Sequence, residues 1–515
     1  MKKSLIITSL ITSLFLVGCH ETTPSSINKT SSSNNSVSNN KLEKLYILSI
    51  NDLHGHIMRD EKGRNGLSSL AYMINSYRNK SALDDVVLIA NGDMFQGQAV
   101  SNLTYGESVI NVMNHMDFNM MGIGNHEFDW GLEKVLTYWD NNNDNGEANF
   151  PLVNSNVYDK TNNLVTQNDK VVPYTIIQKE NLRIGICSAI DPEQESSILK
   201  SRIENYDFKD TVQSIGNTAQ ILRRDEKCDI VIANIHDGVS DNNVESKNNK
   251  AIAALNGTKK IDALINGHTH YRNSGTIARS DSKPLPIVQA GSSGEALGII
   301  TLTLNKEKEV TAVSAEQKYT DTNYDKDIEA LVSDEYNKIK DQVEKVYGTA
   351  GENISNKSDL FSWAASCMQK ATDADIAISN EGGIRGTGNL KNNSPITIEN
   401  LYDINPFDNE ILLTNKTGKQ INAFLSSYGS SHYYITKNVS SNNNNNYFSD
   451  NTTYKVAVID YVGYKDYFAL GTTYQNTKLI YRDVMKLDIE ERTKLNKTFK
   501  PKSEPTSFLT SLVNA

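Results

Sequence analysis

Five short segments of the chain place metal-binding side chains directly after an apolar run. The segments are Asn51-Asp52-Leu53-His54, Asn91-Gly92-Asp93, Gly124-Asn125-His126-Glu127, His236-Asp237 and Gly267-His268-Thr269-His270. Carboxylate, amide and neutral imidazole groups together suit divalent ions of intermediate hardness, such as zinc, manganese, iron or cobalt. None of the segments contains a cysteine thiolate. The pattern therefore indicates a site for divalent metal ions.

The apolar runs that precede these segments predict the elements that position them. LYILSI, VVLIA, FNMMGI, DIVIANI and IDALI are continuous aliphatic stretches, which is typical of strands covered on both faces. Stretches with helical periodicity alternate with them, which favours a layered α/β architecture. Ligands in such sheets gather where strands end, so we expect the five polar segments to meet in space.

Taken singly, most of these residues have a structural explanation. His236 resembles a hydrogen-bonded structural histidine, and Asp93 and Asn125 suit turns. His268 and His270 are better read as a metal pair, because two imidazoles at a buried strand end need a reason. Turns and core histidines have no cause to recur at five strand ends, so the joint pattern favours a metal site.

The ordered series DLHG, GD, GNHE, HDG and GHTH resembles the binuclear metallophosphoesterases. GNHEFDWG narrows the resemblance to the branch of 5'-nucleotidases and 2',3'-cyclic-nucleotide phosphodiesterases, over roughly residues 44–515. The resemblance implies that one divalent ion is held by Asp52, His54 and His270, a second by Asn125, His236 and His268, and that Asp93 bridges them. It is unlike the purple acid phosphatase branch, whose tyrosine ligand would fall at Gln96.

The resemblance also implies the fold and its domains. We expect an N-terminal four-layer metallophosphoesterase domain at 41–320, with two packed sheets flanked by helices, and a linker helix at 321–346. A second α/β domain at 347–515 would bind the substrate.

His126 and Asp129 are the predicted catalytic pair. Asp129 lies at the start of the amphipathic segment EFDWGLEKVLTYW, three residues after His126, and i to i+3 spacing puts both side chains on one helical face. A carboxylate favours a protonated imidazole, which can stabilise charge or protonate the leaving oxygen. A helix-capping Asp129 beside an incidental His126 is the alternative. Glu127 is expected to support the loop. Two ions about 3.5 to 4 Å apart would activate a water for direct hydrolysis of a phosphate ester.

The predicted substrate residues lie in the C-terminal half. ADIAISNEGGIRG reads as a strand followed by a glycine-rich loop, and its NxGGIR motif resembles the nucleotide-binding signature of the same branch. It contributes Asn380, Gly382, Gly383 and Arg385. Phe407, after a proline, matches the first aromatic that stacks on the base.

The partner of Phe407 is left open by the sequence. Tyr461 and Asp466 fit the family pattern best, although Tyr464 is a rival and core packing would also explain Tyr461. The branch commonly has an arginine before the helix that starts near Lys357, and this chain lacks it. Lys357 is a candidate substitute, although an ammonium cannot make bidentate contacts.

The N-terminus predicts export. Residues 1–18 carry two lysines and a short apolar run, which is typical of a secretory signal, and LVGC resembles a bacterial lipobox. We therefore expect lipid attachment at Cys19, a flexible Ser/Thr/Asn-rich tether at 19–40, and a lipoprotein that faces the cell surface or periplasm. The other cysteines, Cys187, Cys228 and Cys367, read as buried thiols.

Composition narrows the function. A formal net charge of −10 disfavours a nucleic acid polymer as partner. The leading hypothesis is a lipid-anchored enzyme that removes phosphate from nucleoside 5'-monophosphates. Alternatives are hydrolysis of 2',3'-cyclic nucleotides, nucleotide sugars or dinucleotides, or a catalytically silent nucleotide-binding surface lipoprotein. The sequence leaves metal identity and oligomeric state open.

Overall fold

The computed structural model describes residues 43–80, 85–143, 146–179, 181–279, 281, 283–428, 433–436, 448–465, 468, 473–507 and 509. The predicted signal, Cys19 and tether lie outside the described residues, so these three stay predictions. Within the described ranges, no helix is both long and apolar enough to cross a membrane. Cys187, Cys228 and Cys367 are free and buried, as predicted.

A seven-stranded sheet carries the first three of the five predicted strands. Its order is β15 (Val310–Tyr319), β14 (Ala296–Leu304), β1 (Glu43–Ile50), β2 (Asp85–Ala90), β3 (Met120–Gly122), β4 (Leu152–Val153) and β6 (Val171–Val172). Strands β1, β2 and β3 run parallel, while β14 pairs antiparallel with β1. The carboxyl ends of β1 to β3 therefore lie along one edge of this sheet.

A six-stranded sheet carries the other two predicted strands. Its order is β12 (Arg272–Ile277), β13 (Leu285–Ala290), β11 (Ala263–Ile265), β10 (Ile230–His236), β8 (Leu182–Ile190) and β7 (Tyr174–Lys179). Strands β10 and β11 are parallel neighbours. Their carboxyl ends again open on a common edge.

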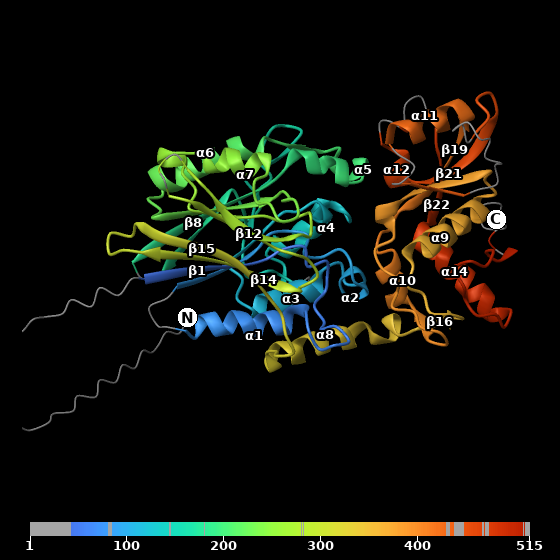
Figure 1. Cartoon of the computed structure of the whole chain (residues 1–515), viewed down its shortest axis with the longest axis horizontal. Helices are drawn as coiled ribbons and strands as arrows, with labels where there is room; N and C mark the ends of the chain where they lie inside the picture. The colour runs from blue at the N-terminus through green and yellow to red at the C-terminus, as the bar shows by residue number, and fades with distance from the viewer. Residues whose placement is uncertain are drawn as a thin grey trace, which may run out of the picture. The chain divides into compact units, whose positions relative to one another are not determined.

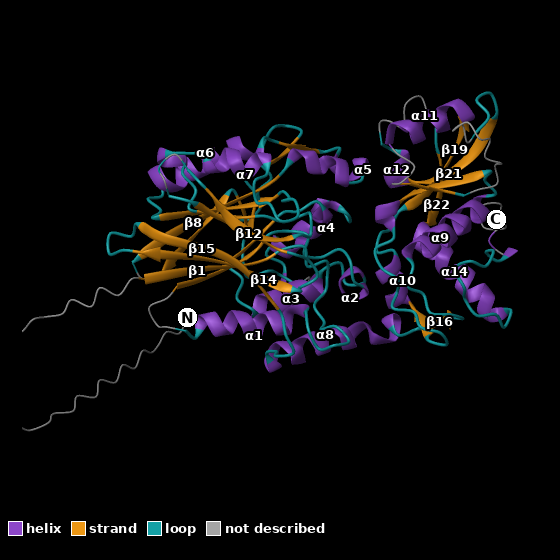
Figure 2. Ribbon diagram, in the orientation of Figure 1, coloured by secondary structure: helices purple, strands orange, loops and turns teal. Residues whose placement is uncertain are grey.

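The two sheets pack face to face and helices cover their outer faces. On β1, Leu45 and Ile47 join the core between the sheets, whereas Leu48 and Ile50 face the outer core. This alternation is the period of two that a strand imposes. Figures 1 and 2 show α1 (Gly66–Arg78) on one side of the sheets and α6 (Thr211–Arg224) with α7 (Lys247–Ala253) on the other. The predicted layering of the N-terminal domain is confirmed.

Helix α8 (Lys326–Val343) occupies the predicted linker but is shorter than 321–346 at both ends. It begins after Asp325, whose carboxylate accepts from the backbone N–H groups of Asp327 and Ile328 at 3.0 and 3.1 Å. This N-cap satisfies two of the donors that every helix start leaves open. The helix packs against α1 and α3 (Glu107–His115).

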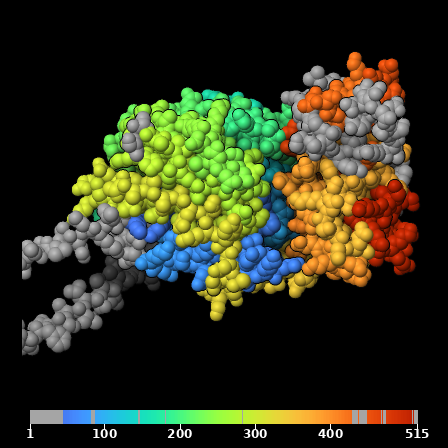
Figure 3. Space-filling model, viewed as in Figure 1, coloured from blue at the N-terminus to red at the C-terminus, as the bar shows by residue number. Residues whose placement is uncertain are grey.

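The C-terminal domain is built on a five-stranded mixed sheet, which confirms the predicted second α/β domain. The sheet order is β20 (Tyr433–Ile435), β17 (Ile376–Asn380), β21 (Thr453–Ile459), β19 (Glu410–Thr417) and β22 (Gln475–Ile480). Helices α9 (Lys357–Thr372) and α14 (Tyr481–Lys494) pack on each other. In the space-filling view, the orange surface of this domain adjoins the green and blue surface of the N-terminal domain (Figure 3).

The remaining elements are short. They are α2 (Ala99–Asn102), η1 (His126–Phe128), α4 (Leu132–Leu136), η2 (Thr137–Trp139), β5 (Val157–Asp159), η4 (Pro192–Ser197), α5 (Lys200–Ile203), β9 (Tyr206–Phe208), η5 (Gly257–Lys259), β16 (Val346–Thr349), η6 (Glu381–Gly383), β18 (Pro395–Thr397), α10 (Ile398–Ile404), α11 (Gly418–Tyr428) and α12 (Asp460–Gly463).

The segment EFDWGLEKVLTYW departs from the single amphipathic helix that its periodicity suggests. It forms the turn η1, then α4, then η2, with Gly131 between the first two. Gly131 has φ 88°, a left-handed conformation that interrupts a right-handed helix. His126 and Asp129 therefore sit on and just after a single turn, and not on a long helix.

Candidate active site

The polar segments gather at the carboxyl ends of the two sheets. Asp52 follows β1, Asp93 follows β2 and Asn125 follows β3, while His236 ends β10 and His268 follows β11. Three groups of potential ligand atoms result, each with all its atoms within 4.8 Å of one another. The groups are Asp52, His54 and His270; His54, Asp93 and His126; and Asp93, His236 and His268.

In the first group, two imidazole nitrogens face each other. His54 Nε2 lies 3.0 Å from His270 Nε2. The other nitrogen of His54, Nδ1, lies 2.9 Å from the carbonyl oxygen of Gln96 and must carry the proton to donate to it. This fixes the tautomer and leaves a lone pair at Nε2, as in metal-ligating histidines.

In the last group, acceptor atoms also converge. His236 Nε2 lies 3.2 Å from Asp93 Oδ2 and 3.2 Å from Asn125 Oδ1. His236 Nδ1 lies 3.2 Å from the carbonyl oxygen of Asn91, which again assigns the proton to Nδ1. His268 Nδ1 approaches Asn125 Oδ1 at 2.8 Å. These ring nitrogens and oxygens together form a donor set that suits a divalent cation.

Asp93 belongs to two of the three groups and is 1% exposed. Its Oδ1 accepts from the backbone N–H of His126 at 2.8 Å. Gly124 makes this approach possible, because a Cβ there would lie 2.3 Å from Asp93 Oδ1. Within the part of the chain that the structure describes, Asp93 is therefore the carboxylate shared by two of these groups.

The backbone is held in an unusual conformation at the ligand residues. Asp52, His54, Asp93, His268 and His270 all have φ between 51° and 79°. Non-glycine residues adopt this left-handed region rarely and at a cost in free energy, and such residues cluster at functional sites. The strain turns side chains two residues apart, such as His268 and His270, into one cavity.

The charge states of His54, His268 and His270 suit metal ligands. Burial holds the pKa of His54 well below its ordinary value, and lowers that of His268 to about 3 and that of His270 to about 4. These three imidazoles are therefore neutral, the form that binds metal. Burial opposes a charge on His236 too, but the carboxylate of Asp93 outweighs it and raises the pKa to about 9. The site thus attracts positive charge. The donor set is consistent with a binuclear centre.

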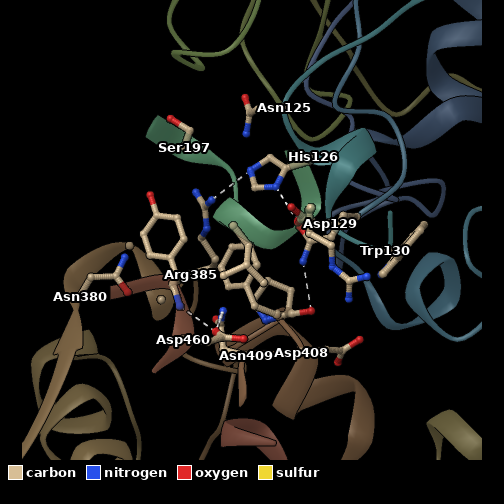
Figure 4. Close-up of a pocket in the computed structure, with 18 of the residues that line it drawn as sticks. Asn125, His126, Asp129, Trp130, Ser197, Asn380, Arg385, Asp408, Asn409 and Asp460 are labelled. Atoms are coloured by element: carbon tan, nitrogen blue, oxygen red, sulfur yellow. Dashed lines mark hydrogen bonds and ion pairs between the residues drawn. The ribbon is translucent and has the colours of Figure 1, made fainter. Parts of the chain in front are cut away.

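His126 points into the same cavity and shares one of the three groups with His54 and Asp93. Its Nδ1 lies 2.7 Å from Asp129 Oδ2, and Arg385 Nη2 lies 3.5 Å from its Nε2 (Figure 4). Burial opposes protonation, but the carboxylates of Asp129 and Asp93 outweigh it and raise the pKa of His126. The carboxylates thus favour the protonated form of this imidazole.

Glu127 supports the backbone of the segments that follow β2 and β3. Its buried carboxylate accepts from the backbone N–H groups of Asp93, Met94 and Gly124 at 2.8, 3.0 and 2.7 Å. These bonds tie the segment after β2 to the segment after β3. Glu127 faces the backbone and not the cavity.

A cavity of about 790 Å³ joins these residues to the C-terminal domain. From the predicted site it is lined by Asp93, Asn125, His126, Asp129, His268, His270, Asn380, Gly382, Gly383, Arg385, Phe407 and Tyr461. Tyr464 lines it as well, so both candidate tyrosines reach the cavity. Asp466 lies outside the described residues. The structure thus brings the metal-type cluster and the predicted nucleotide residues to one space.

Lys357 lies in a neighbouring cavity of about 750 Å³. This cavity is also lined by His54, His270 and Arg385. Lys357 therefore lines the same cavity as three predicted site residues, whereas Phe407 and Tyr461 line the first cavity.

Several residues that line the first cavity were not predicted from the sequence. They include Gln96, Trp130, Arg202, Asn409 and Asp460. Trp130, Asn409 and Asp460 stand one or two positions from predicted site residues, so neighbourhood in the sequence was a usable signal. Gln96 and Arg202 carried no such signal, because they reach the cavity only through the fold.

Two family descriptions match the chain in consecutive regions. Residues 45–272 match the calcineurin-like phosphoesterases, and residues 342–436 match the 5'-nucleotidase C-terminal domain. The first region contains the metal-type residues, and the second contains Arg385 and Phe407.

Curated relatives match at low identity over long spans. The chain is 28% identical over 411 residues to Endonuclease YhcR of Bacillus subtilis, which covers 74% of this chain but only 32% of that protein. It is 24% identical over 532 residues to Protein UshA of Escherichia coli, and the match covers 90% of this chain and 94% of that protein. A 2',3'-cyclic-nucleotide 2'-phosphodiesterase/3'-nucleotidase of Salmonella typhimurium is 24% identical over 491 residues, which cover 82% and 73%.

Among solved structures, a 5'-nucleotidase precursor from Thermus thermophilus superposes with a TM-score of 0.72 at 17% identity. The superposition covers 89% of this chain and 97% of that one. The likeness shows that the two chains share a two-domain fold.

Proposed function

Because the chain is a metallophosphoesterase of the 5'-nucleotidase family, we propose that it hydrolyses nucleoside 5'-monophosphates to nucleosides and phosphate. One observation carries this proposal. A single cavity is lined by the metal-type cluster, by the proton carrier His126, and by Arg385 and Phe407 of the C-terminal domain. A phosphate ester with an aromatic base needs these three features together.

The chain's own residues take distinct roles in this proposal. Asp52, His54 and His270 would hold one divalent ion, and Asn125, His236 and His268 a second, with Asp93 shared. Such ions supply Lewis-acid chemistry at the phosphoryl oxygens and lower the pKa of water. Arg385 would bind the phosphoryl group, and Phe407 with Tyr461 or Tyr464 would hold the base. His126 would deliver a proton to the oxygen of the departing nucleoside.

Hydrolysis of 2',3'-cyclic nucleotides is a second candidate, because a relative named for that activity aligns over 82% of this chain. A panel of AMP, UMP, 2',3'-cyclic AMP and UDP-glucose separates the candidates by kcat/KM. We expect the highest values with AMP or UMP. A preference for the cyclic ester or for UDP-glucose would replace the proposal, and absence of turnover with bound metal would favour a silent nucleotide-binding protein.

As the pH is raised, we expect the Asp129→Asn variant to lose its activity at a lower pH than the parent enzyme does. Asp129 raises the pKa of His126, so it keeps the imidazole protonated to higher pH. Removing the carboxylate charge lowers this pKa, and the protonated form is then lost earlier as pH rises. The alkaline limb of the kcat–pH profile should therefore move to lower pH. A limb that stays in place would show that His126 is not the group that titrates.

We also propose that the chain is exported and lipidated at Cys19, on the strength of the apolar segment and the LVGC sequence before it. The full-length protein, expressed in a bacterium that processes lipoproteins, should partition into the detergent phase of Triton X-114. The Cys19→Ala variant should partition into the aqueous phase. Equal partitioning of the two proteins would contradict lipidation at Cys19.

A further inference from the structure

We propose that the side-chain amides of Gln96 and Asn102 are positioning residues, which hold the nucleotide-binding loop over the metal site by gripping the carbonyl oxygen of Pro406. The inference rests on the proposed function, because it assigns the base of the substrate to Phe407. We call the pair, with the carbonyl they grip, the Pro406 clamp.

The clamp is a double hydrogen bond between the two domains. Gln96 Nε2 donates to the oxygen of Pro406 at 3.1 Å, and Asn102 Nδ2 donates to the same oxygen at 2.7 Å. The two donors are 2% and 6% exposed. A carbonyl oxygen has two lone pairs, so this contact uses its full capacity. Buried polar groups that meet in this way fix geometry more than they add stability.

On the catalytic side, the clamp is built onto a metal-type residue. The carbonyl oxygen of Gln96 accepts from His54 Nδ1 at 2.9 Å, the bond that sets the tautomer of His54. The oxygen of His54 in turn accepts from Gln98 N at 3.0 Å. Asn102 Oδ1 accepts from Gly97 N at 2.8 Å, which orients its amide toward Pro406. These hydrogen bonds therefore fix the positions of both amide donors relative to His54.

On the C-terminal side, the clamped residue lies between the two groups that would bind the nucleotide. Asn405 Nδ2 donates to the oxygen of Gly383 at 2.8 Å, and Arg385 N donates to the oxygen of Ile404 at 2.8 Å. The loop that carries Pro406 is thus tied to the glycine-rich loop. Movement of Pro406 would displace both binding elements together.

Phe407 follows the clamped carbonyl directly, and its ring lies against His126. The ring centroids of Phe407 and His126 are 5.8 Å apart with an interplanar angle of 28°. The guanidinium of Arg385 lies 5.2 Å from the centroid of the same ring. The clamp therefore sets how far the base-binding ring stands from the group that would protonate the leaving oxygen. Small errors in such a distance reduce rate and affinity strongly.

The test uses variants that remove the donors and keep the rest. Gln96→Met keeps the length of the side chain and removes its amide. Asn102→Asp keeps the side-chain oxygen that accepts from Gly97 N. The substrates are AMP and ribose 5-phosphate, which lacks the base. In the double variant we expect kcat/KM for AMP to fall by about tenfold or more, mostly through KM. We expect a smaller fall in kcat/KM for ribose 5-phosphate, because that ester uses Arg385 but not Phe407.

A matched control is Asn114→Asp on α3. Asn114 Oδ1 accepts from Asn149 N at 2.9 Å and its Nδ2 donates to the oxygen of Glu147 at 2.9 Å, the same pattern as Asn102 but within one domain. This variant should leave both substrates unchanged. Metal content, measured by mass spectrometry, should match the parent in all variants.

Hydrogen–deuterium exchange tests the clamp without any substrate. Peptides covering residues 398–410 should exchange faster in Gln96→Met and in the double variant than in Asn114→Asp. Unchanged exchange would overturn the inference, as would equal losses for AMP and ribose 5-phosphate. If the parent enzyme itself does not prefer AMP over ribose 5-phosphate, the proposed function fails, while the exchange result still decides whether the clamp exists.

Discussion

The Asp93→Asn variant is expected to lose phosphoesterase activity and bound metal together. Asp93 is 1% exposed and is shared by two of the three ligand groups. An amide of the same shape removes the negative charge that both halves of the site would use. Loss of a shared ligand should reduce kcat/KM by at least about a thousandfold, beyond the 10- to 100-fold typical of residues that only orient ligands. Metal analysis after dialysis and assays with AMP measure the two effects.

Asp262→Asn is the matched control for this substitution. Asp262 is also buried, in the same domain, but it accepts from Val231 N at 2.9 Å and pairs with Arg223, away from the ligand groups. We expect this variant to keep its metal and its activity, with reduced thermal stability. An Asp93→Asn protein that retains two ions per chain and turns over AMP would contradict the assignment of Asp93 as the shared ligand.

The His126→Ala variant is expected to lose turnover and keep its metal. The imidazole is held by Asp129 at 2.7 Å and faces Arg385, whereas His236 and His268 face the oxygen of Asn125. Removal of a general acid reduces kcat by about 10²- to 10⁴-fold. Steady-state kinetics with AMP and metal analysis of the same sample measure the outcome.

The identity of the leaving group sharpens this second test. p-Nitrophenolate departs without protonation, so p-nitrophenyl phosphate should lose much less rate than AMP when His126 is replaced. His115→Ala is a suitable control, because His115 is exposed and its Nδ1 lies 2.8 Å from the carbonyl oxygen of Asn111 in its own helix. Loss of metal from the His126→Ala protein would make His126 a ligand, a reading that its place in one ligand group leaves open.

Much of the fold could be predicted because it depends on patterns among residues that are close together in the sequence. Continuous aliphatic runs become buried strands wherever both faces are covered, and the five predicted runs are β1, β2, β3, β10 and β11. The predicted linker helix exists because apolar residues recur at helical spacing behind a capping aspartate. The segment after His126 shows the limit of this reasoning. Its periodicity suggests one helix, but Gly131 in a left-handed conformation divides it.

The residue types at the candidate site were also readable, because metal binding requires particular donor atoms and these recur after each run. Their left-handed backbone was not. Nothing in local pattern indicates that Asp52, His54 and His270 each adopt φ above 50°. That strain persists only because the surrounding sheets over-determine it.

The sequence by itself determined which strands form, which side chains end them, and that these side chains suit divalent metals and a phosphate ester. Only the tertiary structure decided that Lys357 opens on a second cavity and that Gln96 and Asn102 meet Pro406. The physical reason is range. Strand and donor patterns are set by neighbours along the chain, whereas contacts across more than 300 positions depend on how two domains pack, which no local pattern encodes.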